Sequence, residues 1–183
     1  FSKKSYFIPK LTHIYWGTIL GKDNKPIKTK SGESVKLNAL INESIDRAYK
    51  IIAKKNPKLL EKERQIIASK IGIGALKYAD LSSNRSQNYV FNWDKMLKFE
   101  GNTAPYLLYV IARINSIFRN ANISDLDFKK CSIMESKYEV EIIKKLMGFA
   151  QAIELTISDL RPHYLCNYLY ELSCSFNTFY NND

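Results

Sequence analysis

Residues that could bind a structural metal or form disulfides are scarce in this chain. Its only cysteines are Cys131, Cys166 and Cys174, and its only histidines are His13 and His163. No two cysteines form a CxxC pair, so a zinc site is not expected, because structural zinc is usually held by closely spaced Cys and His pairs. Reduced, buried thiols are the better interpretation, and they point to an intracellular compartment.

Long apolar runs and export signals are missing as well. No run approaches the roughly 20 apolar residues that a transmembrane helix needs, so we expect no membrane partner. The first ten residues, FSKKSYFIPK, do not begin with methionine and lack the apolar core of a secretory signal. We therefore expect the chain to begin inside a larger protein. Its 183 residues, 45% of them hydrophobic, suit one ordinary domain or one domain with an attached fragment.

Positive charge is concentrated in the first part of the chain. Residues 1–100 hold 20 Lys and Arg against 9 Asp and Glu, whereas residues 101–183 hold 8 against 9, so the first hundred residues supply the whole net charge of +10. A basic surface favours a polyanionic partner, because contact with phosphates releases condensed counterions. On charge alone, RNA, DNA, an acidic membrane surface and a solvated surface without a specific partner all remain open.

The hydrophobic pattern changes its period near residue 35. Residues 1–34 alternate short apolar groups with turn signals such as Pro9, Gly17 and Gly21, which is typical of short strands and loops. From Leu37 onward the apolar residues follow helical spacing. We therefore place a boundary near residue 35.

Five helices are expected after this boundary. They should run from Leu37 to the Asn56-Pro57 stop, from about Leu60 to Asp80, from Thr103 to about Asn120, from Met134 to Ile153, and from Pro162 onward. The core stripe of the third helix is expected at Leu107, Val110, Ile111, Ile114, Ile117 and Phe118. Gly72 and Gly74 lie inside the second helix without a preceding strand, so close helix packing explains them better than a nucleotide-binding glycine motif.

Two segments carry a specific resemblance to a known family. The first, ALKYADLSSNRSQNYVFNWDKMLKFEGNTAPYLLYVIARINSI from Ala75 to Ile117, closely resembles the anticodon-binding region of arginyl-tRNA synthetases. The second, ILGKDNKPIKTKSGESVKLNALINESIDRA from Ile19 to Ala48, resembles the same family's degenerate counterpart of the class I KMSKS loop and the linker after it. The two segments stand in the family's order, and the resemblance covers nearly the whole chain.

The resemblance implies a mainly α fold, in which an anticodon-binding helical bundle is preceded by a short α/β remnant of a Rossmann-type catalytic domain. It divides the chain into the end of the catalytic domain at 1–34, a helical connector at 35–62, and the anticodon-binding α-helical domain at 63–183, without the family's terminal segment. The full-length protein is then expected to be an arginine–tRNA ligase that uses ATP with Mg²⁺.

The same resemblance implies the partners. They are tRNA(Arg), together with arginine and ATP in the full-length enzyme, and no DNA. A cytoplasmic location is expected, with an organellar one as the alternative, and the oligomeric state stays open. By itself, this fragment is expected to bind tRNA, to hold no cofactor and to catalyse neither step of the reaction.

Lys25, Lys28 and Lys30 lie in KPIKTKSG, within the segment that resembles the KMSKS loop. The resemblance implies that all three bind the ATP phosphates and that Lys28 and Lys30 are catalytic, because ammonium groups offset the charge that develops as pyrophosphate leaves. Without the resemblance, a solvated basic turn is the better interpretation. The class I HIGH signature is absent. We interpret His13 to Gly17 as an apolar strand before the loop, and we expect the arginine-binding half of the active site on preceding sequence.

Tyrosines, amides and arginines in and beside the polar loop SSNRSQN form the expected RNA site. The resemblance places this loop against the anticodon, and single-stranded bases are read by stacking on aromatic rings and by hydrogen bonds to amides and guanidinium groups. The expected tRNA-binding residues are Tyr78, Asn84, Arg85, Asn88, Tyr89, Tyr106, Tyr109, Arg113 and Tyr164. For each tyrosine taken singly a core role is the more common one, and Arg85 is the best individual candidate.

Two other classes of function remain open. A non-catalytic helical protein-interaction module would use the apolar faces near residues 140–180 as a partner groove, and a generic basic RNA-binding bundle would bind RNA without amino acid specificity. Replacing Arg85 and Tyr89 with alanine separates the three hypotheses. Selective loss of cognate tRNA binding, by ~1 to 3 kcal/mol for a stacked base, is expected of the synthetase. Equal loss for every RNA favours the generic bundle, and no loss favours the protein-binding module.

Overall fold

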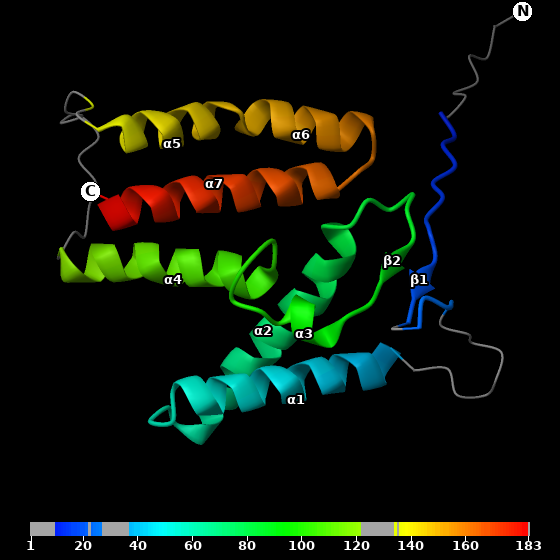
Figure 1. Cartoon of the computed structure of the whole chain (residues 1–183), viewed down its shortest axis with the longest axis horizontal. Helices are drawn as coiled ribbons and strands as arrows, with labels where there is room; N and C mark the ends of the chain where they lie inside the picture. Colours follow the sequence, from blue (N-terminus) through cyan, green and yellow to red (C-terminus); the bar gives the residue numbers. More distant parts are fainter. Residues whose placement is uncertain (1–9, 22, 27–36, 122–133, 135, 183) are drawn as a thin grey trace, which may run out of the picture.

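Helices dominate the part of the chain that the computed structural model describes, which is residues 10–21, 23–26, 37–121, 134 and 136–182 (Figure 1). In chain order the elements are β1 (Ile19–Leu20), α1 (Leu37–Lys55), α2 (Glu61–Leu81), β2 (Tyr89–Val90), α3 (Trp93–Met96), α4 (Ala104–Asn120), α5 (Lys137–Met147), α6 (Phe149–Ser158) and α7 (His163–Asn182). The predicted fold class, a helical bundle preceded by a short α/β segment, is confirmed.

Helices α1 and α2 form a hairpin with a close contact at Gly72. The hydroxyl of the fully buried Ser44 donates to the Gly72 carbonyl at 2.7 Å. A Cβ at Gly72 would lie 2.8 Å from both the Cα and the backbone nitrogen of Ile45. Close packing as the reason for Gly72 is therefore confirmed. For Gly74 it is wrong, because a Cβ there would meet nothing within 4 Å.

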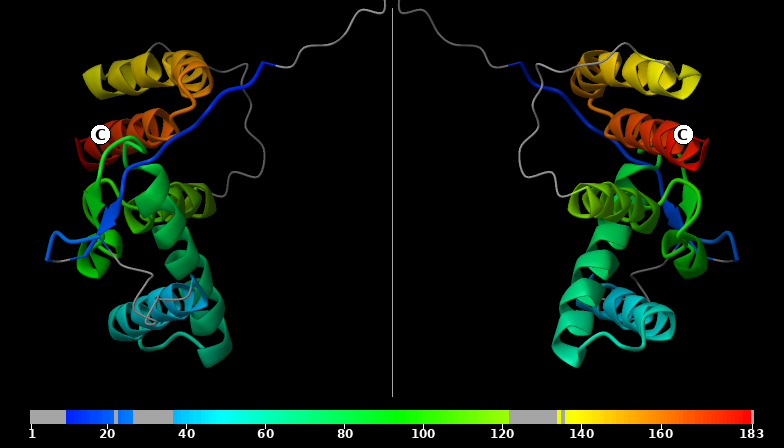
Figure 2. Two further views of the ribbon diagram at one scale, coloured as in Figure 1. Left: turned by 90° about the vertical axis from the view of Figure 1, so that its right-hand side faces the viewer. Right: turned by 90° about the vertical axis from the view of Figure 1, so that its left-hand side faces the viewer.

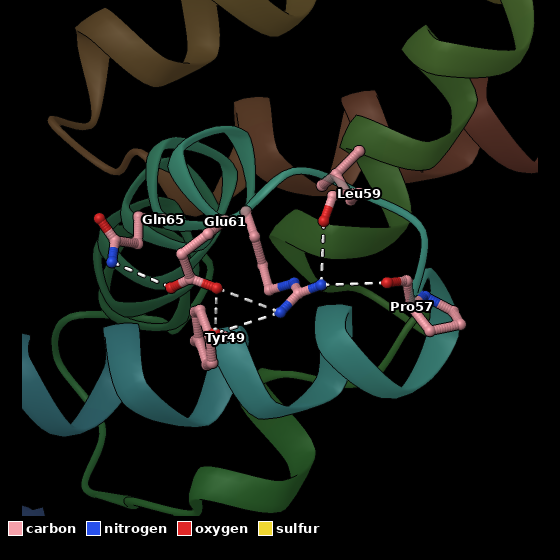
Figure 3. A network of polar contacts seen from close by, with 6 residues as sticks. Tyr49, Pro57, Leu59, Glu61 and Gln65 are labelled. Atoms are coloured by element: carbon pink, nitrogen blue, oxygen red, sulfur yellow. Dashed lines mark hydrogen bonds and ion pairs between the residues drawn. The ribbon is translucent and has the colours of Figure 1, made fainter.

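A polar network fixes the turn between α1 and α2 (Figure 3). The Arg64 guanidinium donates through Nη2 to the carbonyls of Leu59 at 2.9 Å and Pro57 at 3.2 Å. Its Nη1 lies 3.2 Å from Glu61 Oε2 and 3.2 Å from the Tyr49 hydroxyl, which itself donates to Glu61 Oε2 at 2.7 Å. This one side chain therefore ties the turn to both helices.

The hydrophobic core of the hairpin extends to α3 and the start of α4. Its buried members are Ala48, Ile52, Ala68, Ala75, Met96, Leu97 and Ala104. Trp93 packs against this core, with its ring edge-on to Phe91 at 4.8 Å between centroids and 5.3 Å from the Arg47 guanidinium. An indole in this position anchors the segment after the polar loop to the helices.

Helix α7 lies between α4 on one side and α5 with α6 on the other (Figure 1). Helix α2 joins this layer to α1, because it contacts α1, α4 and α7. In the end-on views of Figure 2, the segment before β1 runs past the turn between α6 and α7. The N-terminal segment and the helical bundle are therefore adjacent in space.

Helix α4 begins where the sequence predicts. The Thr103 hydroxyl accepts a hydrogen bond from the Tyr106 N–H at 3.3 Å, and Pro105 lies in the first turn. Val110 is buried as expected. For other residues of the expected core stripe the prediction of burial is wrong, because α4 is covered by α2 and α7 along only part of its surface. The exposed fractions there are 54% for Ile111, 36% for Ile117 and 37% for Phe118.

The single helix that the sequence predicts over 134–153 is two helices. The first starts after Ser136, whose backbone N–H donates to the Glu139 carboxylate at 3.0 Å in a capping box. At Gly148 the N–H bonds to the Lys145 carbonyl at 3.0 Å, three residues back, which is a tighter turn than the α-helix allows. The helical path therefore bends between α5 and α6.

The predicted strand from His13 to Gly17 is wrong. These residues form no strand, and the pairing lies immediately after them, where β1 runs parallel to β2. Gly17 crosses the polar loop so closely that a Cβ would collide with the Gln87 carbonyl. Glycine is needed there for a close backbone approach, and the paired segment can begin only beyond it.

Candidate nucleic-acid interface

The polar loop between α2 and β2 is held largely by its own amide side chains. Asn84 Oδ1 accepts hydrogen bonds from the N–H of Ser86 at 3.2 Å and from its hydroxyl at 2.8 Å. Asn88 Oδ1 accepts from the Thr18 N–H at 2.7 Å. Amide side chains commonly stabilise turns in this way. Asn84 therefore shapes the loop, and Asn88 ties it to the N-terminal segment.

Tyr89 also has a partner within the fold. Its hydroxyl donates to Asp80 Oδ1 at 3.3 Å, across the base of the loop. Burial and the neighbouring Asp80 carboxylate raise the pKa of Tyr89 to about 12. The tyrosine is thus held in its neutral form, and its hydroxyl bond orders the loop.

Arg85 directs its guanidinium at backbone carbonyls from two distant segments. Its Nε donates to the carbonyl of Leu160 at 2.9 Å and its Nη2 to that of Asp159 at 3.3 Å, both at the end of α6. Its Nη1 donates to the Tyr15 carbonyl at 2.7 Å in the N-terminal segment. All three guanidinium nitrogens are therefore already engaged in the folded chain.

A hollow of about 910 Å³ lies between α2, the β2–α3 segment and the start of α4. The Tyr78 hydroxyl on its wall lies 2.6 Å from Asn102 Oδ1 and 3.0 Å from the Cys166 carbonyl of α7. Asn102 in turn donates to Asn167 Oδ1 at 3.0 Å. Burial first, and then the Cys166 thiol, raise the pKa of Tyr78 well above its ordinary value. Both cationic and anionic side chains, including Lys95 and Asp94, line the same hollow.

A chain of hydrogen bonds continues along the seam between α4 and α7. The Tyr106 hydroxyl accepts from Asn177 Nδ2 at 2.7 Å and lies 3.6 Å from Cys174 Sγ. The Tyr106 ring contacts the Tyr170 ring edge-on, with centroids 5.6 Å apart. Burial raises the pKa of Tyr106, which is consistent with a phenol that packs between helices. Tyr106 is therefore a seam residue.

At the far end of the seam, two tyrosine rings enclose one guanidinium. Arg113 Nη2 donates to the Tyr109 hydroxyl at 2.7 Å, and Nη1 donates to Asn177 Oδ1 at 2.9 Å. The guanidinium carbon lies 4.8 Å from the Tyr109 ring centroid and 4.4 Å from that of Tyr180. The exposed fractions of Tyr109 and Tyr180 are 46% and 44%. This Tyr109–Arg113–Tyr180 stack offers solvent an ordered aromatic and cationic surface.

The remaining expected residues are dispersed. Tyr164 lies at the start of α7, where its hydroxyl donates to Asp159 Oδ2 at 3.1 Å and its ring contacts that of His163. Lys25 is exposed in the turn after β1, where its backbone N–H donates to Asp23 Oδ1 at 3.2 Å. Lys28 and Lys30 lie outside the described residues. No group of three or more His, Cys, Asp and Glu side chains in the described ranges could hold a metal ion.

The structure brings Tyr78, Tyr106, Tyr109 and Arg113 together along α7, whereas Arg85 and Asn88 bond to the N-terminal segment and Asn84 bonds within the loop. Sequence reasoning missed Tyr180, Asn177 and Asn102. Tyr180 and Asn177 are three residues apart on one helical face, which is a signal that they act together. Their contact with α4 depends on tertiary packing, which the sequence of α7 alone does not predict.

No helix of the described residues combines the length and the apolar character that crossing a bilayer requires.

Two family models match the chain in sequence. The model for the catalytic domain of class I tRNA synthetases (R) matches residues 2–93, and the model for the DALR anticodon binding domain matches residues 107–183. The arginine–tRNA ligase of Serratia proteamaculans is 43% identical over 181 residues, which are 97% of this chain and 31% of that protein. The one from Saccharophagus degradans is 48% identical over 168 residues, 92% of this chain and 29% of that protein. The chain thus spans about a third of the length of the curated relatives it matches.

Solved structures agree with the sequence matches. The arginyl-tRNA synthetase of Thermus thermophilus superposes with a TM-score of 0.77 at 27% identity, over 92% of this chain and 27% of that one. The arginyl-tRNA synthetase of Plasmodium falciparum gives a TM-score of 0.77 at 29% identity, over 91% of this chain and 28% of that one.

Proposed function

Since the chain belongs to the arginyl-tRNA synthetase family of class I, we propose that it forms the anticodon-binding part, with the end of the catalytic domain, of an arginine–tRNA ligase. In this proposal the longer protein attaches arginine to tRNA(Arg) at the expense of ATP, with Mg²⁺ as the metal. This chain contributes the recognition of the tRNA.

The observation that carries the proposal is the Tyr109–Arg113–Tyr180 stack. Unpaired bases bind to exposed aromatic rings and guanidinium planes, and this surface holds both in a fixed arrangement. Asn177 reaches it from α7 and holds Arg113 in place through its side-chain oxygen. Residues 101–183 hold 8 Lys and Arg against 9 Asp and Glu, so stacking and hydrogen bonding have to supply much of the affinity in this region.

Within this proposal, the expected site residues differ in role. Tyr109 and Arg113 contact RNA directly. Tyr78 and Tyr106 form the seam and the wall behind them, Tyr164 packs at the turn between α6 and α7, and Asn84, Arg85, Asn88 and Tyr89 position the loop. This assignment is supported by the internal partners of the other groups and by the exposure of Tyr109.

The division of the chain is also part of the proposal. We assign 1–34 to the end of the catalytic domain, 35–62 to the connector and 63–183 to the anticodon-binding domain. Contacts of α2 with α4 and α7 support its assignment to the bundle. Lys25, Lys28 and Lys30 are proposed to bind ATP phosphates in the longer protein, and the exposure of Lys25 fits such a contact. A cytoplasmic location completes the proposal, supported by free Cys166 and Cys174 thiols.

The direct test measures binding of two RNA hairpins, one with an arginine anticodon and one that differs by a single anticodon base. Tyr109→Ala should weaken binding of the cognate hairpin by roughly 1–3 kcal/mol and reduce the preference between the two. Ile111→Ala is the control, since it shortens an exposed side chain on the same helix. Arg85 and Tyr89 are poor sites for this test, because both have partners within the fold.

The other functions give different results. Equal weakening for both hairpins, with a steep dependence on salt, would indicate generic phosphate binding. Unchanged binding of both hairpins by Tyr109→Ala would remove the stack from the interface and favour a protein-interaction module.

A further inference from the structure

His163 begins α7 at the turn that follows α6, and one of its ring nitrogens is enclosed (Figure 1). Among the described residues, its Nδ1 is buried from solvent and has no hydrogen-bond partner. The ring packs on that of Tyr164, with 4.4 Å between the centroids. A neutral imidazole tolerates such a place far better than an imidazolium, because burying an unpaired charge costs much more than burying a neutral polar atom.

The carbonyls of the turn between α6 and α7 are all in use. Each already accepts a hydrogen bond, and they belong to Asp159, Leu160, Arg161 and Pro162. The Arg85 side chain donates to the first two, at 3.3 Å from Nη2 and at 2.9 Å from Nε. Backbone N–H groups of α7 donate to the other two at 3.2 Å. A proton on His163 Nδ1 would therefore have to compete with one of these donors for a carbonyl.

Charges around His163 also oppose its protonation. The Arg85 guanidinium reaches the turn from the polar loop, and the first residue of a helix lies at the positive end of its dipole. Burial first, and then the charges of Arg161 and Arg85, lower the pKa of His163 below its ordinary 6.5. The Asp159 carboxylate is the anionic group of the turn, and it already accepts from the Tyr164 hydroxyl at 3.1 Å. The titratable and charged groups of the elements packed here are Arg85 in the loop, Arg161 and Asp159 in the turn, Tyr164 and Cys166 in α7, Tyr78 in α2 and Tyr15 in the N-terminal segment.

Arg85 ties this turn to the N-terminal segment. Through Nη1 it donates to the Tyr15 carbonyl at 2.7 Å, and its own carbonyl accepts from the Gly17 N–H at 2.6 Å. We call these contacts, with those to the Asp159 and Leu160 carbonyls, the Arg85 joint. Leu160 adopts a φ of 54°, a left-handed conformation that is unfavourable for leucine and is maintained here by its surroundings. The turn therefore stays in this conformation only while the joint holds it.

We propose that His163 is an acid-sensitive latch: its neutral ring lets Arg85 hold the turn between α6 and α7, and protonation in mild acid opens the Arg85 joint. The closed state binds a proton at His163 less readily than the open state does. Its stabilisation is therefore fully present above pH 6.5 and is lost as the pH falls through the lowered pKa of His163. Each pH unit below 6.5 favours opening by at most about tenfold. The latch needs no ligand, so the inference does not depend on the proposed function.

The test follows the ring protons of His163 by NMR and the protection of backbone amides in the 183-residue chain, from about pH 7.5 to 5, without RNA. Protection is taken relative to the intrinsic exchange rate at each pH. The ring should titrate below pH 6.5. Over the same pH range the Gly17 and Arg161 amides, which bond to the Arg85 and Thr156 carbonyls, should lose roughly threefold or more of their protection. The amides of α1 should keep theirs.

Three variants separate the latch from a general effect of acid. His163→Phe keeps a ring against Tyr164 without a titratable nitrogen, so the protection of Gly17 should no longer fall in acid. His13→Gln is the matched control, because His13 is the only other histidine and is exposed, and it should behave as the unmodified chain. Arg161→Gln removes one opposing charge. It should move both the ring titration and the loss of protection to higher pH, which a purely structural role of His163 would not do.

Several results overturn the latch. They are titration of the His163 ring at or above pH 6.5, unchanged protection of Gly17 and Arg161 in acid, an equal loss throughout α1, and the same loss in His163→Phe. If His163→Phe does not fold, Arg161→Gln decides the question: a loss of protection at the same pH as in the unmodified chain overturns the proposal. Because no RNA is present, failure of the proposed function leaves these results unchanged.

Discussion

Gly72 and Gly74 form a matched pair for testing how closely α1 packs against α2. Both lie in α2 with ordinary helical backbone, so replacement by alanine brings each the same gain in helix propensity, about 1 kcal/mol. They differ in what a methyl group would meet. At Gly72 the new Cβ would lie 2.8–2.9 Å from backbone atoms of Ser44 and Ile45, whereas at Gly74 it would meet nothing within 4 Å.

The steric cost at Gly72 falls on backbone, which cannot rotate away as a side chain can. Helix α1 has to move outward, and the buried hydrogen bond from the Ser44 hydroxyl to the Gly72 carbonyl lengthens. Overpacking of this kind costs roughly 1–3 kcal/mol. Gly74→Ala should therefore stabilise the chain by about 0.5–1 kcal/mol, and Gly72→Ala should be less stable than Gly74→Ala by roughly 1–3 kcal/mol.

The measurement is urea denaturation followed by helical circular dichroism, with thermal melting as a second readout. For a chain of this size, the difference between the two variants corresponds to roughly 2–12 °C in Tm. A further variant, Ser44→Ala, should lose about 1 kcal/mol through its hydrogen bond alone. If Gly72→Ala and Gly74→Ala were equally stable, the close contact between the two helices would be refuted.

Three further predictions concern the loop and the bundle. Gly17→Ala should separate the N-terminal segment from the Gln87 carbonyl, seen as faster amide exchange in β1 with little change in α5–α7. The pKa of Tyr89 is raised from 10.0 to about 12 in the folded chain. Its neutral phenol therefore contributes its full stabilisation of the folded state below pH 10. This stabilisation is lost as the pH rises toward 12, because the phenol ionises first in the unfolded chain. In Tyr89→Phe, the free energy of unfolding measured with urea should therefore fall less steeply over that pH range. A fall as steep as in the unmodified chain would contradict the raised pKa of Tyr89. Ser136→Ala should remove the capping box and cost ~1 kcal/mol, while a change below a few tenths would mean that the cap contributes nothing.

Local signals were enough to predict four helices closely, namely α1, α2, α4 and α7. Helix α1 ends before Pro57, and α4 starts after Thr103, because proline and a capping hydroxyl act within one turn of their own position. The break at Gly148 was harder to foresee, since the apolar spacing continues on both sides of it. The Ser136 capping box was readable in the sequence, and it would have placed the start of α5 correctly.

The candidate site was predictable only in part. Tyr109 and Arg113 are four residues apart on one helix, so their pairing follows from helix geometry. Tyr180 completes the stack from another helix, and no local pattern indicates that contact. Tertiary contacts also explain why the role of Arg85 was mispredicted. Its place in a polar loop suggested an arginine free to bind RNA, but its carbonyl partners are 70 to 75 positions away in sequence.

The two-residue ladder between β1 and β2 has a consequence for the order in which the chain folds. Thr18 and Asn88, which flank it, are 70 positions apart, so the ladder closes a long loop for very few hydrogen bonds. The entropy of closing that loop has to be offset before the contact forms, and the α1–α2 hairpin within the loop shortens the path between its two ends. During synthesis the segment before β1 emerges ahead of the helices, yet it has to wait until the loop after α2 has left the ribosome. Within this chain, a segment made before the helices is therefore among the last to fold.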